Sequence, residues 1–473
     1  ARLSTMRADL AVARPILSAR HASVLLASHS LEDDVGAVAL LAGTAIGGGF
    51  LALPATTAPA GCVPSALLLL GASGALLAEA YIVADLVIEV SRQEGRPVSL
   101  STCARRTLGG TAGAAVEALF ILLMCSTLVS QFAKGGSLLS TWLGLPYQAG
   151  CALVVASLSL FSLGAPRHLI SQVNGRLAAG FAISLAALFA CGAPLADWTA
   201  LYRADWPAAY GSAPTILQLL VYNEIVPTVC AMLRFDRSRV RRALGCGAAL
   251  LLLILSSWSA LGICLAAAVS SGALGVPALG AGAVTTDPVA WLLGSRSALG
   301  RSAAALAVCA VSTTVLATNL ALQTLFTDLA DRTGKSTGDA APPPADQRTT
   351  VSGTSPPAPS LGTRQYGSGG WWRFGALPLS LLASLICASL SPDAFFGAID
   401  FAGAYPVALL WGVAPPVMAL AAARREGSRL RPRTVVGLVG LALAALLFVA
   451  SNAATDIGGF VMRGAGGAAR WRR

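Results

Sequence analysis

Two apolar segments of the chain contain residues that interrupt a helix. The first, AGTAIGGGFLALP at 42–54, holds four glycines, each of which costs a helix interior about 1 kcal/mol relative to alanine. The second, LVYNEIVPTVC at 220–230, sets Asn223 and Glu224 close to Pro227, which lacks the amide donor of a helix. An interrupted membrane helix presents free N–H and C=O groups to a ligand's anionic and cationic groups. A zwitterionic amino acid carries both charges.

Glycines also let a ligand approach the backbone closely, which suits a substrate carboxylate. Helix packing is the alternative explanation, because glycines are common where membrane helices touch and a proline often only kinks a helix. Two interrupted segments, one with a carboxylate, favour a binding site over packing. The candidate substrate-binding residues are Gly43, Thr44, Ala45, Gly47, Gly48, Gly49, Tyr222 and Asn223.

Glu224 is the candidate for carrying a coupled proton. An ionisable side chain inside a membrane-spanning segment is costly and indicates a functional site by default. A carboxyl group can take up and release a proton as water reaches it from one side or the other. The alternative role for Glu224 is a fixed acceptor that caps the N–H groups freed by the interruption.

Five ionisable residues inside other apolar segments are also considered. Glu79 and Asp85 are six positions apart and do not share a helix face, so they are predicted to pair with cations near a membrane face. Glu117 and Lys134 are expected near the two membrane surfaces. Asp400 is a candidate for lining the substrate pathway.

The chain that must position these residues is mostly apolar. It has 473 residues, of which 55% are hydrophobic and 12% charged, with a mean hydropathy of +0.70. A soluble domain is about a quarter charged. Apolar blocks such as 67–90 and 243–269 exceed the roughly 20 residues that cross a bilayer as a helix. The composition predicts an all-α polytopic membrane protein, and not a β-barrel, whose strands would alternate.

About eleven transmembrane helices are predicted, and the basic residues support this number. Loops on the N-terminal side of the predicted membrane hold 21 Lys and Arg, and those on the other side hold 3, which places the N-terminus inside. The interrupted segments are spans one and six, a spacing typical of two inverted five-helix repeats. The predicted spans are 35–58, 63–90, 114–140, 148–164, 174–193, 212–233, 243–270, 302–330, 375–391, 395–420 and 434–453.

Three regions are predicted outside the transmembrane domain of 33–453. Residues 1–30 are rich in Arg and Ser and poor in acids, which fits either an organelle transit peptide or a cytoplasmic tail. Residues 334–370, rich in Pro, Ser, Thr and Gly, are predicted to form a disordered inside-facing loop. Residues 454–473 are assigned to a C-terminal tail.

Several functions are not expected. The net charge of +11 is explained by topology, so no nucleic-acid partner is predicted. The ten cysteines form no CxxC pair, and no metal or cofactor is predicted. The histidines are confined to a tail or a loop, and no HExxH, GxSxG or Walker motif occurs, which argues against an integral membrane enzyme and an ATP-driven pump. The histidines are His21, His29 and His168.

Four motifs resemble those of one transporter family, in order, from about residue 33 to 452. AGTAIGGGFLALP resembles the first-helix motif of the tyrosine/tryptophan permeases, the hydroxy and aromatic amino acid permease family. YNEIVP at 222–227 resembles the sixth-helix pattern of that family. The segment at 227–243 is most similar to the plant, algal and cyanobacterial branch. The other two motifs are LALQTLFTDLAD at 320–331 and FFGAIDFAGAYPVALLWGVAPPVMAL at 395–420.

The resemblance implies a member of the amino acid–polyamine–organocation superfamily, with a five-plus-five inverted repeat and an eleventh helix. It implies proton symport of aromatic amino acids by alternating access, and, with a transit peptide, the plastid (chloroplast) envelope. Two positions depart from the family: Asn223 stands where histidine is frequent, and Glu224 where Asn or Asp is usual.

Sodium-coupled transport of another neutral amino acid is the alternative function. In sodium-coupled relatives of this fold, hydroxyls on the eighth helix bind the ion together with carbonyls of the first. Hydroxyls in membrane helices mostly bond to their own backbone, which favours the proton. Thr318 and Asn319 are retained as pathway candidates. The polar residues of the predicted eighth span are Ser312, Thr313, Thr314, Thr318 and Asn319.

Overall fold

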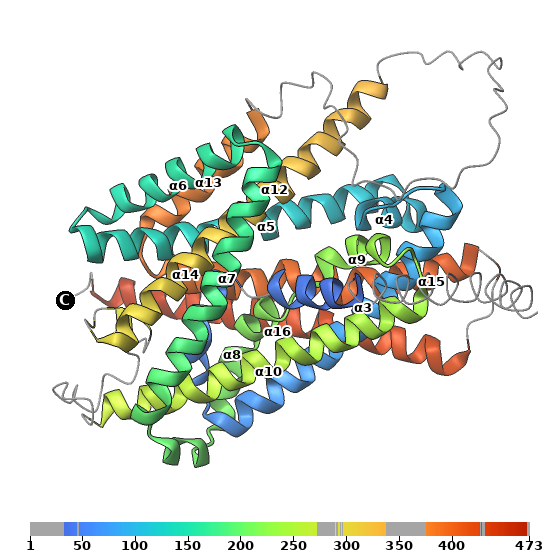
Figure 1. Ribbon diagram of the computed structural model, residues 1–473. Helices are drawn as coiled ribbons and strands as arrows, with labels where there is room; N and C mark the ends of the chain where they lie inside the picture. Colours follow the sequence, from blue (N-terminus) through green and yellow to red (C-terminus); the bar gives the residue numbers. More distant parts are fainter. Residues whose placement is uncertain are drawn as a thin grey trace, which may run out of the picture.

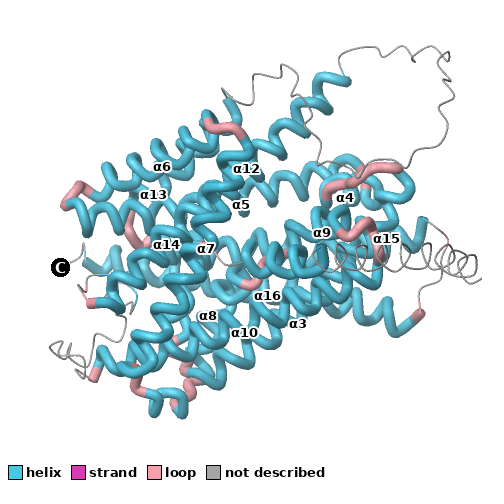
Figure 2. The backbone as a smooth tube through the Cα atoms, in the orientation of Figure 1, coloured by secondary structure: helices cyan, strands magenta, loops and turns pink. Residues whose placement is uncertain are grey.

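The computed structural model describes residues 33–44, 47–271, 297–336, 375–425 and 431–470, and the isolated residues 289, 292, 293, 295 and 427. In these residues the regular structure is helical, with short connections between helices (Figure 2). Nine of the described helices are long and apolar enough to cross a membrane, and the bent pair Asp33–Thr44 and Gly48–Thr57 makes a tenth. The chain is an all-α multi-pass membrane protein, as predicted.

The helices follow the predicted spans closely. The ninth predicted span, 375–391, contains only a 14-residue helix, which is shorter than a full crossing. Helices α12 and α16 continue beyond the spans predicted for them. The helices are α3 (Cys62–Glu94), α4 (Leu100–Leu108), α5 (Gly110–Leu143), α6 (Tyr147–Gly164), α7 (Arg167–Gly192), α8 (Trp206–Leu219), α9 (Val226–Met232), α10 (Arg237–Ser270), α12 (Ala298–Ser336), α13 (Leu377–Leu390), α14 (Ala394–Ala402), the π-helical η6 (Gly403–Val413), α15 (Ala414–Arg425) and α16 (Pro432–Arg470).

Some predicted features lie outside the described residues. These are the N-terminal tail 1–30, the part of the predicted loop from 337 to 370, the end of the C-terminal tail at 471–473, and the candidate residue Ala45.

Figure 1 shows two groups of packed helices, one with α5, α6, α12 and α13 and the other with α3, α8 and α10. In one group, α5 packs against α6, α12, α13 and α14. In the other, α3 packs against α10, α8 and α15. The turn η1 (Gly48–Ala52) contacts α5, α8 and α12, while η4 (Asn223–Ile225) contacts α3. Each interruption therefore meets helices that are distant from it in the sequence.

Ion pairs join the helix ends at one end of the bundle, which we call the basic end. There Arg241 pairs with Asp85 at 2.7 Å, and Arg239 pairs with Asp34 at 2.9 Å. The predicted pairing of Asp85 is confirmed. Arg105 pairs with Glu117 at 2.6 Å, so Glu117 lies near the start of α5, as expected.

The prediction for Glu79 is wrong, whereas the position of Lys134 relative to the membrane surface stays a prediction. Glu79 is 2% exposed near the middle of α3, and its Oε2 has no hydrogen-bond partner. The Lys134 side chain is buried between α5 and α14, with its Nζ 4.8 Å from the centre of the Phe395 ring. Distance from a helix end does not determine which helix face meets the bundle, and an aromatic ring can stabilise a buried ammonium group.

At the opposite end of the bundle, a close contact fixes the chain after the first interrupted helix against the start of α8. Gly61 has φ +84°, and a Cβ there would lie 2.2 Å from the Arg203 carbonyl oxygen, so only glycine fits. The Asp205 amide donates to the Ala60 carbonyl at 2.8 Å. Asp205 is also the N-cap of α8, accepting from the Ala208 amide at 3.2 Å. The connection after the first predicted span thus holds the start of α8, which is the first half of the sixth predicted span.

Candidate substrate site at the two interrupted helices

The first interruption is a bend of 51° between Asp33–Thr44 and Gly48–Thr57. Gly47 is extended at the bend, with φ −125° and ψ −166°, and the chain then forms η1 and the short helix α2 (Leu53–Thr57). The predicted glycine-rich interruption is therefore present in the structure. Gly43 and Thr44 belong to the preceding helix, where the Thr44 hydroxyl donates to the Leu40 carbonyl.

At each of the three consecutive glycines of the bend, an added Cβ would overlap a neighbouring side chain. A Cβ on Gly48 would lie 1.6 Å from Gln131 Oε1. A Cβ on Gly47 would lie 2.5 Å from Thr314 Oγ1, and one on Gly49 would lie 2.8 Å from Leu219 Cδ2. A Cβ on Gly43, by contrast, meets no heavy atom within 4 Å. Among the four glycines of this motif, the close packing is therefore confined to 47–49.

Hydrogen bonds hold the bend in place. The Gly48 amide donates to Thr314 Oγ1 at 2.8 Å, and the Thr314 hydroxyl donates to the Ala310 carbonyl at 2.8 Å. The Phe50 carbonyl accepts from Trp258 Nε1 at 2.8 Å, and the two rings stack with centroids 5.1 Å apart. The bend is thus attached to α12 on one side and to α10 on the other.

Gln131 is a residue of this site that the sequence analysis missed. Its side chain is 1% exposed, its Nε2 donates to Ser130 Oγ at 2.9 Å, and its Oε1 has no hydrogen-bond partner. Because a Cβ on Gly48 would lie 1.6 Å from Gln131 Oε1, that oxygen lies directly beside the Gly48 backbone. The signal in the sequence is an amide in the middle of an apolar helix, because its buried polar atoms need partners inside the bundle.

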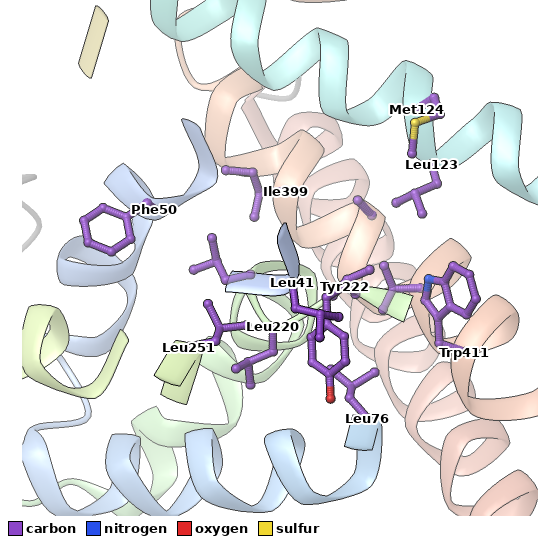
Figure 3. Close-up of a cluster of buried hydrophobic side chains, with 14 of the residues drawn as sticks. Leu41, Phe50, Leu76, Leu123, Met124, Leu220, Tyr222, Leu251, Ile399 and Trp411 are labelled. Atoms are coloured by element: carbon purple, nitrogen blue, oxygen red, sulfur yellow. The ribbon is translucent and has the colours of Figure 1, made fainter. Parts of the chain in front are cut away.

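The second interruption separates α8 from α9. Tyr222 immediately precedes the short turn η4, and Pro227 falls in the first turn of α9, where its missing amide costs no hydrogen bond. The proline therefore begins a new half-helix and does not kink a continuous one. Asn223 is fully buried, and its Nδ2 donates to the Leu76 carbonyl at 3.3 Å. Tyr222 lies in an apolar cluster with Leu41, Leu76, Leu220 and Trp411 (Figure 3).

The remaining candidates occupy different surroundings. Glu224 is half-buried and, among the described residues, accepts no hydrogen bond. The Asp400 carboxylate accepts a short hydrogen bond from the Thr215 hydroxyl of α8. Asn319 is buried, and its Nδ2 lies 3.3 Å from Ser159 Oγ on α6. Thr318 is buried one helical turn from Thr314, the α12 hydroxyl that reaches the first interruption.

The Gln131 amide oxygen should contribute to substrate binding. We expect Gln131→Ala to raise the KM for uptake about 10- to 100-fold, because a hydrogen bond to a charged group contributes about 1.5–3 kcal/mol. Saturation uptake in proteoliposomes measures this. Gln93→Ala is the control, since Gln93 lies at the basic end of α3 and donates to Glu89 at 3.0 Å. An unchanged KM in Gln131→Ala would remove Gln131 from the site.

The two half-helix interruptions, packed between flanking helices, define a class of protein: transporters with the leucine-transporter-type fold. A model of the tryptophan/tyrosine permease family matches residues 32–455. The chain belongs to that family and is a secondary transporter of amino acids. No curated protein sequence matches the chain.

Solved structures align with this chain at low sequence identity. The manganese transporter of Eremococcus coleocola, in complex with an aromatic bis-isothiourea substituted compound, has 15% identity and a TM-score of 0.53. That alignment covers 91% of this chain and 88% of the other. MhsT in complex with L-phenylalanine aligns with 14% identity and a TM-score of 0.49, over 88% of this chain and 96% of the other.

Proposed function

We propose that the chain transports an aromatic amino acid of the tyrosine or tryptophan kind together with a proton, by alternating access. The substrate binds at the first interruption, close to the second. The observation that carries this proposal is the bend at Gly47, Gly48 and Gly49, where an unpartnered amide oxygen of Gln131 lies beside bare backbone.

The two charges of the substrate have different partners in this proposal. The half-helix that begins at Gly48 directs its positive end toward the interruption, which favours the substrate carboxylate. The substrate ammonium donates to Gln131 Oε1 and to carbonyls freed by the interruption. Leu219 and Ile399 side chains both lie within 4.0 Å of the Cβ position of Gly49, and such apolar surroundings suit the substrate's aromatic ring.

Coupling to a proton is supported by Glu224, a half-buried carboxyl group in the second interruption. Sodium is the second candidate, because the Thr314 hydroxyl lies at the first interruption. That hydroxyl accepts from an amide N–H and donates to a carbonyl of its own helix, which leaves one of its two lone pairs for an ion. The proton is the first candidate because Glu224 is ionisable and the hydroxyl is not.

The test is uptake of labelled amino acids into proteoliposomes. We expect accumulation of tyrosine, tryptophan or phenylalanine under an inward pH gradient, and none when the gradient is collapsed at constant sodium. Accumulation that follows sodium at constant pH would favour the second candidate. Uptake of small neutral amino acids in preference to aromatic ones would contradict the proposed substrate class.

We also propose the plastid envelope as the membrane, on the support of the Arg- and Ser-rich composition of residues 1–30. Fluorescence microscopy of the tagged chain in plant cells tests this. Labelling of the plasma membrane without plastids would contradict it.

A further inference from the structure

Lys134 is a buried cation that the proposed transport mechanism does not use. Its side chain is 7% exposed, and its Nζ lies 4.8 Å from the centre of the Phe395 ring on α14. Phe395 is itself 2% exposed, so the ammonium group lies inside the bundle. A positive charge in a low-dielectric interior strongly attracts an adjacent anion. This attraction holds whatever other contacts Lys134 makes.

Helix α5 carries Lys134 directly beside the candidate substrate site. Lys134 lies three positions after Gln131, and residues at that spacing are neighbours on a helix surface. Gln131 Oε1 lies beside the Gly48 backbone at the bend. Three residues advance a helix by about 4.5 Å. Because α5 begins near the basic end, Lys134 is less than one helical turn beyond the bend, on the side away from the basic end.

Helix α14 shows the same arrangement in the opposite direction. Phe395 meets Lys134, and Ile399 follows four positions later, on the same face of α14. Ile399 Cδ1 lies 4.0 Å from the Cβ position of Gly49, at the bend. The two helices therefore run antiparallel here, with Ile399 level with Gln131 and Phe395 level with Lys134.

Helix α12 gives a third measure of the level of Lys134. Val311 Cγ1 lies 3.4 Å from the Cβ position of Gly135, the residue after Lys134. Thr314, three positions after Val311, accepts from the Gly48 amide at 2.8 Å. Helices α5, α12 and α14 thus each bring one residue to the bend and another to the level of Lys134. The three helices agree on where the buried ammonium group lies relative to the site.

The Lys134 side chain leans toward the bend. Side chains on a helix lean toward its N-terminal end, which for Lys134 is the direction of Gln131. Lysine has a flexible four-carbon stem that ends in three N–H donors. The ammonium group can therefore reach an anion bound at the bend while the stem stays between α5 and α14.

The charge of Lys134 determines which end of a substrate lies near it. An amino acid carries a carboxylate and an ammonium group, and only the carboxylate is attracted to Lys134. In the proposed function Gln131 Oε1 accepts from the substrate ammonium, nearer to the basic end. The substrate backbone then lies along α5. Of the carboxyl groups at the ends of α14, Asp400 accepts from the Thr215 hydroxyl, and Asp393 is exposed.

We propose that the Lys134 ammonium group binds the substrate carboxylate and makes a free carboxylate a requirement for recognition. Phe395 positions the ammonium group through its ring. The half-helix that begins at Gly48 directs its positive end to the same carboxylate. This role rests on the proposed site at the bend, but it requires neither an aromatic substrate nor coupling to a proton.

Competition between an amino acid and its amide tests the role of Lys134. Uptake of labelled tyrosine by the full chain in proteoliposomes is inhibited with unlabelled tyrosine or with tyrosinamide, in which a neutral amide replaces the carboxylate. We expect the parent to need about 100-fold more tyrosinamide than tyrosine for half-inhibition. In Lys134→Met, which keeps a side chain of similar length, we expect that ratio to fall about tenfold.

Three further variants separate the charge of Lys134 from its packing. Lys134→Arg keeps the charge and should retain the parent's ratio. Lys134→Gln is a second neutral variant and should behave as Lys134→Met does. Arg92→Met removes an exposed charge in the last turn of α3 and should leave the ratio unchanged. The rise in Tm caused by each compound gives the same ratio in nanodiscs, because it requires binding without transport.

The ratio distinguishes recognition of the carboxylate from a structural role. A structural role would weaken the binding of both compounds equally. The proposal is overturned if the parent binds tyrosinamide as well as tyrosine, or if both neutral variants retain the parent's ratio. If leucine is bound and aromatic amino acids are not, the proposed substrate class fails, and leucine with leucinamide measures the ratio instead. Uptake that follows sodium would contradict the proposed coupling and leave the ratio unaffected.

Discussion

Gly48→Leu is expected to reduce amino acid uptake at least 100-fold while the protein still inserts into the membrane. A Cβ at this position would lie 1.6 Å from Gln131 Oε1, and the rest of the leucine side chain would occupy the space beside the bend. That space is where the substrate carboxylate approaches the start of the half-helix in the proposed function. Uptake in proteoliposomes, normalised to the amount of reconstituted protein, measures the effect.

Loss of packing must be separated from loss of binding in this variant. Inserting a large side chain into a packed site costs about 1–3 kcal/mol of stability. Gly71→Leu is the matched control, because Gly71 is exposed and a Cβ there meets no heavy atom within 4 Å. We expect Gly71→Leu to transport normally. If Gly48→Leu inserts and transports as well as Gly71→Leu, the glycines serve helix packing and the proposed site is wrong.

A smaller change at the same position tests the contact itself. Gly48→Ala adds only the Cβ, and the nearest atoms belong to the flexible end of Gln131. We expect the thermal stability lost in Gly48→Ala to return in the double variant with Gln131→Ala, because the two side chains then no longer overlap. Uptake should stay low in the double variant, since Gln131 Oε1 is absent.

The interruptions could be predicted from the sequence because their causes are local. Glycine weakens a helix wherever it occurs, and Pro227 begins α9 where its missing amide is harmless. The pairing of Asp85 was also predictable, because the arginines of 237–242 belong to the loop on the same side of the membrane. In each case the residue types and their predicted place along the chain carry the information, without knowledge of how the helices pack.

The partners of the interruptions could not be predicted in the same way. Gln131 meets Gly48 because α5 packs against η1, and nothing near either residue in the sequence specifies that contact. Thr314 bonds to the Gly48 amide, while Asn319, five positions later on α12, bonds to α6. Successive residues on a helix point in different directions, so the choice among the α12 side chains depends on how the helix is rotated in the bundle.

Glu224→Gln is expected to abolish accumulation driven by a pH gradient while exchange of substrate across the membrane continues. Glutamine keeps the size of the side chain but cannot release a proton. Asn223 cannot titrate either, so Glu224 is the ionisable group available within the second interruption. Counterflow of labelled tyrosine measures exchange, and uptake with and without a pH gradient measures accumulation. Asp33→Asn, at the start of the first helix, is the control and should accumulate substrate normally.

The structure supports this role over a fixed cap. The capping carboxylates of this chain accept hydrogen bonds from backbone amides: Asp205 from Ala208 at 3.2 Å and Asp236 from Ser238 at 2.9 Å. Glu224 accepts none from the residues that the structure describes, and it is half-buried at the point where two half-helices separate. A carboxyl group without fixed donors can change its protonation as water reaches it from either side. If Glu224→Gln still accumulates substrate in proportion to the pH gradient, Glu224 is structural, and the proton is carried by another group of the chain.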